Sequence, residues 1–129
     1  MANLEIYKAS AGSGKTYTLT RKYLGYLFNP TTTHRNILAV TFTNKATEEM
    51  KVRILKELYL ISINSERADH IDFFCKKLSV TPKDLSTQAQ EILKTLLNEY
   101  SAFQISTIDK FFLKIIQAFT HEMSLNGNY

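Results

Sequence analysis

The sequence predicts an α/β fold in which helices flank a small, mostly parallel sheet. Short apolar runs that suit strands occur at residues 4–8, 37–42 and 103–107, and longer amphipathic stretches that suit helices lie between and after them. Strands that alternate with helices are typical of parallel sheets with right-handed crossovers. The 129 residues, 44% of them hydrophobic, are enough for one such domain with its own core.

The first strand, helix and second strand follow from the spacing of apolar residues. Residues 4–8 alternate apolar and polar side chains and lead directly into the small residues 9–14. From Lys15 onward apolar residues recur at helical spacing as far as Asn29-Pro30, where the proline disfavours a helical residue ahead of it. Residues 37–42 form a near-continuous apolar run, which is typical of a strand buried on both faces of a parallel sheet.

The middle of the chain is predicted to be helical. Asn44 is the expected N-cap of a helix whose apolar stripe continues to Ile61. A short helix is expected near residues 68–78. We expect the helical stretch 44–100 to lie to one side of the sheet, with residues 62–100 as a helical insertion.

The last elements have clearer start signals. Thr81 as N-cap, Pro82 at the first helical position and an acid two residues later predict a helix start. Residues 103–107 are predicted to form a third strand, and Asp109 is the expected cap of a final helix. The apolar stripe of that helix consists of Phe112, Ile115, Ile116, Phe119 and Met123.

Composition narrows the class of protein only slightly. The 16 Lys and Arg outnumber the 12 Asp and Glu, and the net charge of +4 favours anionic partners such as nucleotides or nucleic acid. No apolar stretch reaches the ~20 residues of a membrane helix and no export signal is evident, so we expect no membrane partner and a cytoplasmic location. His34, His70 and His121 lack metal-like spacing and are expected at surface or cap positions.

Residues 9–16 match the phosphate-binding pattern Gly-x-x-x-x-Gly-Lys-[Ser/Thr] at every fixed position except the first, which is alanine. Its glycines permit a backbone that turns successive N–H groups toward an anion at a helix N-terminus. A glycine-rich turn ahead of a helix is the alternative, but the flanking strand and helix favour a P-loop NTPase fold. The predicted nucleotide-binding residues are Ala9, Ser10, Ala11, Gly12, Ser13, Gly14, Lys15 and Thr16.

Two of these residues have individual roles in the prediction. Lys15 is expected to reach the β- and γ-phosphates of ATP and to act as the catalytic residue, because its charge offsets the charge that develops as the γ-phosphoryl group leaves. The hydroxyl of Thr16 is expected to bind Mg²⁺. The expected cofactors are therefore ATP and Mg²⁺.

A second segment of interest, residues 41–46, follows a predicted strand and opens a helix. Ligands commonly bind at this carboxyl edge of a parallel sheet. Phe42 suits stacking on a base while its polar neighbours contact phosphates. A core phenylalanine beside an ordinary cap is the alternative, and spacing alone favours it. Lys51, Arg53 and Lys56 are equally compatible with a DNA-facing surface and with a solvated helix face.

Three segments together resemble motifs of UvrD/Rep-type superfamily 1 DNA helicases. Residues 9–16 resemble the phosphate loop of that family, residues 40–50 resemble the segment after its second strand, and residues 105–112 resemble its next DNA-contacting segment. The form of the phosphate loop is most similar to the RecB and AddA helicase–nuclease branch, the exonuclease V beta subunit. The resemblance covers residues 1–61 and 101–123.

The resemblance implies the first RecA-like lobe of an ATP-driven motor that moves along single-stranded DNA. The second lobe would come from the rest of a longer helicase chain, and a nuclease domain or subunit is a further expected partner. The residues implied to line the DNA track are Phe42, Thr43, Asn44 and Thr107. Asp109 stands where the family usually has histidine, which favours a capping role.

Hydrolysis by such a motor needs a strand ending in Asp-Glu and arginines from the second lobe, and this sequence has neither. We therefore expect an N-terminal piece of a larger protein that binds Mg·ATP weakly and hydrolyses essentially none. One alternative is a small kinase with Asp109 as its metal-binding acid, although no arginine follows Arg67. Another alternative is a nucleotide-binding regulatory module.

Overall fold

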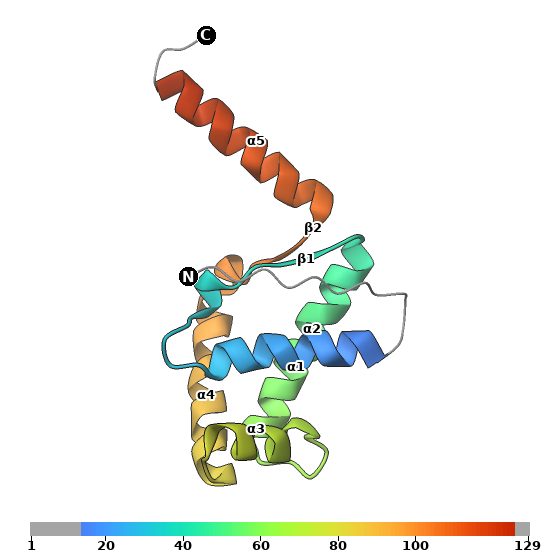
Figure 1. Cartoon of the computed structure of the whole chain (residues 1–129), viewed down its shortest axis with the longest axis vertical. Coiled ribbons are helices and arrows are strands. Elements are labelled where there is room, and N and C mark those ends of the chain that lie inside the picture. The colour runs from blue at the N-terminus through green and yellow to red at the C-terminus, as the bar shows by residue number, and fades with distance from the viewer. Residues whose placement is uncertain (1–13, 126–129) are drawn as a thin grey trace.

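The computed structural model describes residues 14–125, with side chains described for 17–101 and 103–124. In chain order the elements are α1 (Gly14–Phe28), η1 (His34–Asn36), β1 (Ala39–Thr41), α2 (Asn44–Ser62), α3 (His70–Leu78), α4 (Pro82–Asn98), η2 (Tyr100–Ala102), β2 (Ile105–Thr107) and α5 (Ile108–Leu125). Figure 1 shows α1 to α4 packed together below the two strands, while α5 leads away from them. The helix-rich α/β prediction is confirmed in this part of the chain, and the strand predicted at residues 4–8 lies outside it.

The two strands form a parallel pair. Ala39 is opposite Ile105, and Thr41 is opposite Thr107. Between the strands the chain passes through α2, α3 and α4, which together make the crossover that any parallel pair requires. The predicted position of the helical stretch to one side of the sheet is confirmed (Figure 1).

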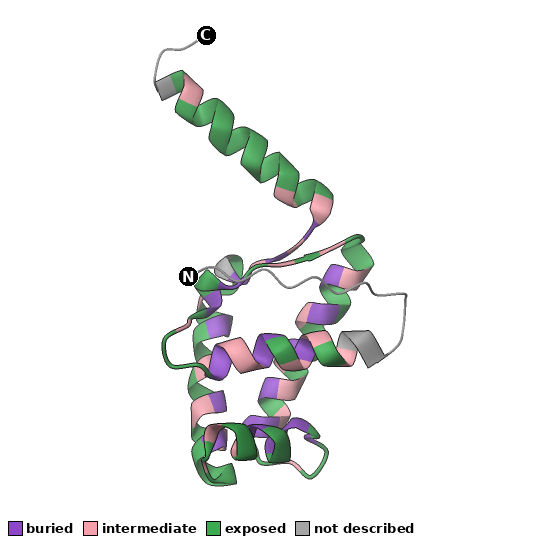
Figure 2. Ribbon diagram, viewed as in Figure 1, coloured by how far each residue is buried: buried purple, intermediate pink, exposed green. Residues whose placement is uncertain are grey.

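The prediction that residues 37–42 form a strand buried on both faces is wrong for the described residues. The strand is limited to Ala39–Thr41. Ile37 is buried, but Leu38 exposes 45% and Val40 exposes 36% of its surface. In the described part of the chain the helices cover only one face of the pair, so side chains on the other face meet solvent (Figure 2).

The core is built around one stripe of α2. Met50, Ile54, Leu58 and Ile61 recur every three or four residues, and each is at most 2% exposed. They pack with apolar residues of α1, α3 and α4 in one cluster. Burying a side chain of this size stabilises the fold by about 1.5–3 kcal/mol. This confirms the predicted core stripe of the helix.

Two helix starts show how capping defines these boundaries. The Thr81 hydroxyl accepts a hydrogen bond from the backbone N–H of Asp84 at 3.1 Å, as predicted. The next cap differs from the prediction, because the Thr43 hydroxyl accepts from the N–H of Ala46 at 3.0 Å and Asn44 is already the first helical residue. Threonine and asparagine are both favoured N-caps, and asparagine is slightly the better one, so residue type alone pointed to Asn44 rather than to its neighbour Thr43.

The predicted core stripe of the last helix is exposed in the described structure. Phe112, Ile115, Ile116 and Phe119 expose between 47% and 65% of their surface. Only the start of α5 is close to the strands, and the rest of the helix extends away from the bundle (Figures 1 and 2). Helical periodicity identified the apolar face correctly, but it carries no information about what covers that face.

A buried polar network joins α1 to α3. Of the predicted surface or cap positions, the surface alternative is wrong for His70, which is 1% exposed, and for His34, which is 4% exposed; each is the first helical residue after an N-cap. The Nδ1 atom of His70 accepts a hydrogen bond from Arg21 Nε at 3.0 Å, and its ring stacks on Tyr17 with centroids 4.8 Å apart. Arg21 also donates from Nη2 to the Tyr17 hydroxyl at 2.8 Å, and its guanidinium lies 4.1 Å from the centroid of the Phe73 ring.

This network fixes the protonation state of the imidazole. Burial, and then the charge of Arg21, lower the pKa of His70 to about 4, so the ring is neutral at pH 7. A neutral ring is what the Arg21 hydrogen bond requires, since Nδ1 must be an acceptor. Glu57 Oε2 lies 3.7 Å from His70 Nε2, which is too long for a hydrogen bond, and burial is the main cause that raises the pKa of Glu57.

We predict that the chain loses stability between pH 6.5 and pH 4. The unfolded state takes up a proton on His70 near pH 6.5, whereas the folded state takes it up only near pH 4, so acid favours unfolding throughout this window. At pH 5 the expected loss in the free energy of unfolding that His70 causes is about 1–2 kcal/mol. Glu57 reduces this loss, because its pKa is raised in the folded state and acid therefore favours folding through this group. Urea unfolding monitored by circular dichroism at a series of pH values measures it.

The matched control for this prediction is His70→Gln, which keeps an acceptor for Arg21 but does not titrate. Its stability should vary less with pH over the same window. An equal slope in both proteins would contradict the role given to His70.

A second prediction concerns Gly25, in the middle of α1. A Cβ atom built there would lie 3.7 Å from Phe74 Cε1 and 3.9 Å from Lys77 Nζ, which are ordinary contacts. Gly25→Ala should therefore stabilise the chain by about 0.5–1 kcal/mol, because alanine restricts the unfolded backbone without strain in the helix. Urea unfolding at pH 7 checks this, and a loss of stability would show that the packing around α1 cannot accept a methyl group.

Candidate nucleotide and nucleic-acid site

The phosphate loop lies mostly outside the described residues. Ala9 to Ser13 are not among them, nor are the side chains of Lys15 and Thr16. The described backbone shows that α1 begins at Gly14, so a helix does start within the motif as predicted. The roles of Lys15 in phosphate binding and catalysis, and of Thr16 in Mg²⁺ binding, stay predictions.

The second part of the predicted site lies at the carboxyl edge of the strand pair. β1 ends at Thr41 and β2 ends at Thr107, and these two residues are opposite each other in the sheet. From this edge the chain enters α2 at Asn44 and α5 at Ile108. The N-termini of two helices therefore lie at one edge of the strand pair, and their partial positive charges favour the binding of anions there. The structure places Thr107 at the same edge as the consecutive residues Phe42, Thr43 and Asn44, from which it is far away in the sequence.

Three threonines hold the turn between β1 and α2. The hydroxyl oxygens of Thr41 and Thr47 are 2.6 Å apart, and each lies 3.2 Å from the carbonyl oxygen of Thr43. The Thr43 hydroxyl in turn caps the helix at the N–H of Ala46. Every one of these contacts spans six residues or fewer, so the turn is fixed locally. Its shape is therefore set before any ligand binds.

Phe42 projects from this fixed turn with 82% of its surface exposed. The interpretation as a core phenylalanine, which spacing alone favoured, is therefore wrong in the described structure. Thr43 and Asn44 beside it are also exposed. An exposed aromatic side chain next to polar groups and a helix N-terminus can stack on a base while its neighbours contact a phosphate.

Thr107 is placed differently from these exposed residues. It is 5% exposed, and its hydroxyl accepts a hydrogen bond from the N–H of Lys110 at 3.3 Å. Thr107 thus caps α5, and the prediction that Asp109 does so is wrong. Asp109 is exposed within the first helical turn, where its carboxylate still interacts favourably with the helix dipole. Direct contact between Thr107 and DNA stays a prediction.

A hollow of about 350 Å³ lies beside the same edge, between α2, β2 and α5. Asn44 lines it, together with Lys51 from α2 and with Lys110 and Lys114 from α5. The ammonium group of Lys51 lies 5.5 Å from the centroid of the Tyr100 ring. Among the described lining residues Glu48 is the one acid against three lysines, so cations predominate and the surface suits an anionic ligand.

Sequence reasoning missed most of this basic hollow. Lys51 was considered as a DNA-facing residue, but Lys110 and Lys114 were not. Their spacing of four residues on a helix was a usable signal, because it places both ammonium groups on one face. That these two lysines line the same hollow as Lys51 depends on the pairing of β1 with β2, so local sequence could not predict it.

Two negative findings complete the description. Among the described side chains, no group of three or more His, Cys, Asp or Glu residues could hold a metal ion. Within the same part of the chain, no helix is both long and apolar enough to cross a membrane.

Comparison with known proteins agrees with these observations. The family model of the UvrD/REP helicase N-terminal domain matches residues 4–129, which includes the segment 62–100. RecBCD enzyme subunit RecB of Buchnera aphidicola is 34% identical over 129 residues, covering 91% of this chain and 11% of the relative. An ATP-dependent helicase/nuclease subunit of Lactobacillus acidophilus is 32% identical over 128 residues, covering 96% of this chain and 8% of the relative.

A shorter match has higher identity. The ATP-dependent DNA helicase Rep of Buchnera aphidicola is 49% identical over 55 residues, covering 43% of this chain and 8% of the relative. No solved structure matches the chain significantly. The chain spans only about a tenth of the length of the curated relatives that it matches, at 11%, 8% and 8%. The match to nearly all of its residues nevertheless shows that this chain belongs to the UvrD/Rep helicase family, through the N-terminal domain that the family model describes.

Proposed function

We propose that this chain is the ATP-binding corner of the first RecA-like lobe in an ATP-dependent DNA helicase. The observation that carries the proposal is Phe42, which is 82% exposed at an edge where two helices begin. In a chain of this family, such an edge suits single-stranded DNA. The adjoining phosphate loop would supply nucleotide binding to the same lobe.

The proposed binding of ATP is supported by the residue types of the phosphate loop and by the position at which α1 begins. A helix that begins at Gly14 directs its first N–H groups toward the preceding loop, where a phosphate would bind. Lys15 would neutralise the β- and γ-phosphates, and Thr16 would provide a hydroxyl ligand to Mg²⁺. The bound ion would offset charge on the phosphates.

The proposed binding of DNA is supported by the residues at the carboxyl edge of β1 and β2. Phe42 would stack on a base, while the polar groups of Thr43 and Asn44 contact the backbone of the strand. Lys51, Lys110 and Lys114 would attract the neighbouring phosphates, because they line the hollow beside Asn44. Stacking and charge neutralisation together bind a single strand without reading its sequence.

The partners of the whole protein follow from the relatives. Their names describe an enzyme subunit, a helicase/nuclease subunit and an ATP-dependent DNA helicase. We infer that the rest of a longer helicase chain supplies the second lobe and the acidic strand needed for hydrolysis. A nuclease domain or subunit is the further partner that similarity to RecB and to the Lactobacillus helicase/nuclease favours.

The first functional prediction concerns nucleotide binding. The 129-residue chain should bind Mg·ATP weakly and hydrolyse essentially none, and Lys15→Ala should abolish the binding because the phosphates lose their cation. Isothermal titration with Mg·ATP measures this. Lys94→Ala, on the exposed face of α4, is the control and should leave binding unchanged. DNA-stimulated hydrolysis by the isolated chain would contradict the prediction.

The second functional prediction concerns the DNA edge. Phe42→Ala should weaken binding of a labelled oligo-dT by about tenfold, since stacking on one base contributes about 1–3 kcal/mol. Fluorescence anisotropy at fixed salt measures the affinity. Phe42→Trp should retain it, because the ring face is kept.

The matched control is Phe119→Ala, which removes a ring that is 65% exposed on α5. Its affinity for oligo-dT should stay within about twofold of the unmodified chain, since most surface substitutions have small effects. Equal losses for Phe42→Ala and Phe119→Ala would show that exposed rings contribute non-specifically, and the proposed edge would then be wrong.

A further inference from the structure

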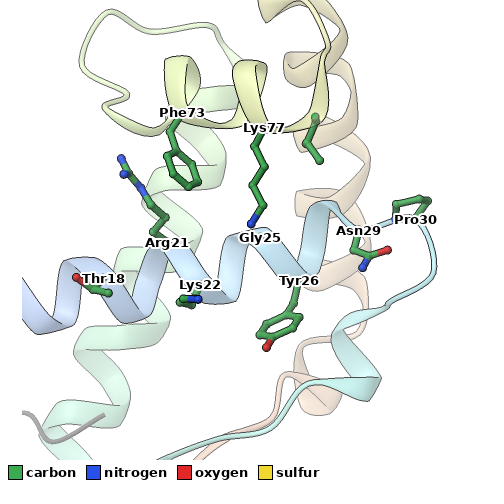
Figure 3. Close-up of a pocket in the computed structure, with 10 residues that line it drawn as sticks. Thr18, Arg21, Lys22, Gly25, Tyr26, Asn29, Pro30, Phe73 and Lys77 are labelled. Carbon is green, nitrogen blue, oxygen red and sulfur yellow. The ribbon is translucent and has the colours of Figure 1, made fainter. Parts of the chain in front are cut away.

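A groove between α1 and α3 takes no part in the site described above. It encloses about 430 Å³, and its lining includes Arg21, Lys22, Gly25, Phe73, Lys77 and Leu78. In Figure 3 the side chains of Phe73 and Lys77 reach from α3 toward α1, and Arg21 rises from α1 beside Phe73. In Figure 1 α3 lies at the end of the bundle away from the strands. We call this surface the α1–α3 groove.

The groove is positively charged. Among the lining residues that the structure describes, three are basic and none is Asp or Glu. The hydrogen bonds of Arg21 go to the imidazole of His70 and the hydroxyl of Tyr17. The imidazole is neutral at pH 7, because burial and the charge of Arg21 lower the pKa of His70 to about 4. The guanidinium is therefore held in place while its charge stays available to an anionic partner.

Gly25 lies in the middle of α1 and lines this groove. A glycine inside a helix is unfavourable, and the chain's own packing does not require one here, because a Cβ atom would make only ordinary contacts with Phe74 and Lys77. The space left by the missing side chain is bounded by Phe74 and by the flexible end of Lys77, so a molecule in the groove reaches the α1 backbone there once the Lys77 side chain turns aside.

The rings of the groove argue against a nucleic acid as its occupant. Single strands bind by stacking bases on accessible aromatic faces. The Phe73 ring already has the Arg21 guanidinium 4.1 Å and the Lys77 ammonium 5.8 Å from its centroid. Tyr26 points away from α3 in Figure 3. A protein segment with carboxylates and an apolar side chain fits the same charges and needs no stacking.

We propose that the α1–α3 groove binds an acidic amphipathic helix of a partner protein. The helix crosses α1 at Gly25, places an apolar side chain beside Leu78, and directs carboxylates to Arg21 and Lys77. Because the groove and the strand edge lie at different ends of the molecule, this partner and DNA can bind together.

The test uses the 129-residue chain and a fluorescein-labelled helical peptide with leucines on one face and glutamates flanking them. Fluorescence anisotropy at pH 7 gives the dissociation constant. A peptide of the same pattern with lysine in place of glutamate, and oligo-dT as a competitor, are measured alongside. The acidic peptide should bind, the basic peptide should not, and oligo-dT should not displace the acidic peptide.

Two substitutions place the peptide in the groove. Lys77→Glu should raise the dissociation constant by about tenfold, because an attractive charge becomes repulsive. Gly25→Ala should weaken binding by about threefold although it stabilises the fold, so loss of structure cannot explain the effect. Lys94→Glu makes the same charge change on α4, outside the groove, and should change the constant less than about twofold.

Three outcomes would overturn the proposal. The first is failure of the acidic peptide to bind. The second is equal weakening by Lys77→Glu and Lys94→Glu, which would indicate attraction by overall charge. The third is displacement of the peptide by oligo-dT, which would identify a nucleic-acid surface. None of these results depends on Phe42 or Lys15, so they can be distinguished from failure of the proposed helicase function.

Discussion

Parallel pairing of β1 with β2 is the constraint on which the described structure depends. A parallel pair cannot be closed by a tight turn, so the chain must travel through α2, α3 and α4 before it returns. Those helices, with α1, supply the buried core. The register that places Thr41 opposite Thr107 also makes both strands end at one level. Two helices then start at one edge of the strand pair. The exposed Phe42 lies at this edge, in the turn between β1 and the N-cap of α2.

Much of this could be predicted from local sequence because the signals are local. Pro30 ends α1, and Thr81 with Pro82 starts α4, since each acts on its own backbone within a turn of helix. The predictions failed where a distant segment decides the outcome. Val40 and Phe119 have apolar side chains, but whether they are covered depends on elements elsewhere in the fold. His70 is polar, yet it is buried because Arg21 and Tyr17 approach it from another helix.

The candidate site shows the same division. The segments that carry Phe42 and Thr107 were recognised by their motifs, whereas the meeting of Lys51 with Lys110 and Lys114 depends on the strand register. The N-caps were hardest to predict, because two nearby residues could each take that role. Thr43 and Asn44 are both good caps, as are Thr107 and Asp109, and in both cases the residue nearer the strand takes that role. Thr107 is the last residue of β2 and Thr43 lies in the turn fixed by neighbouring threonines, so in each case the backbone that carries the capping hydroxyl is already held in place.

The separation of β1 from β2 by three helices also affects the order of folding. Contacts between neighbouring helices close short loops, whereas the strand pair closes a loop that contains all of α2, α3 and α4. The helical bundle is therefore expected to form first during synthesis, and the strands to pair only after β2 has left the ribosome. The edge that bears Phe42 matures last. Until then, the newly made chain presents a formed helical bundle without the completed strand edge.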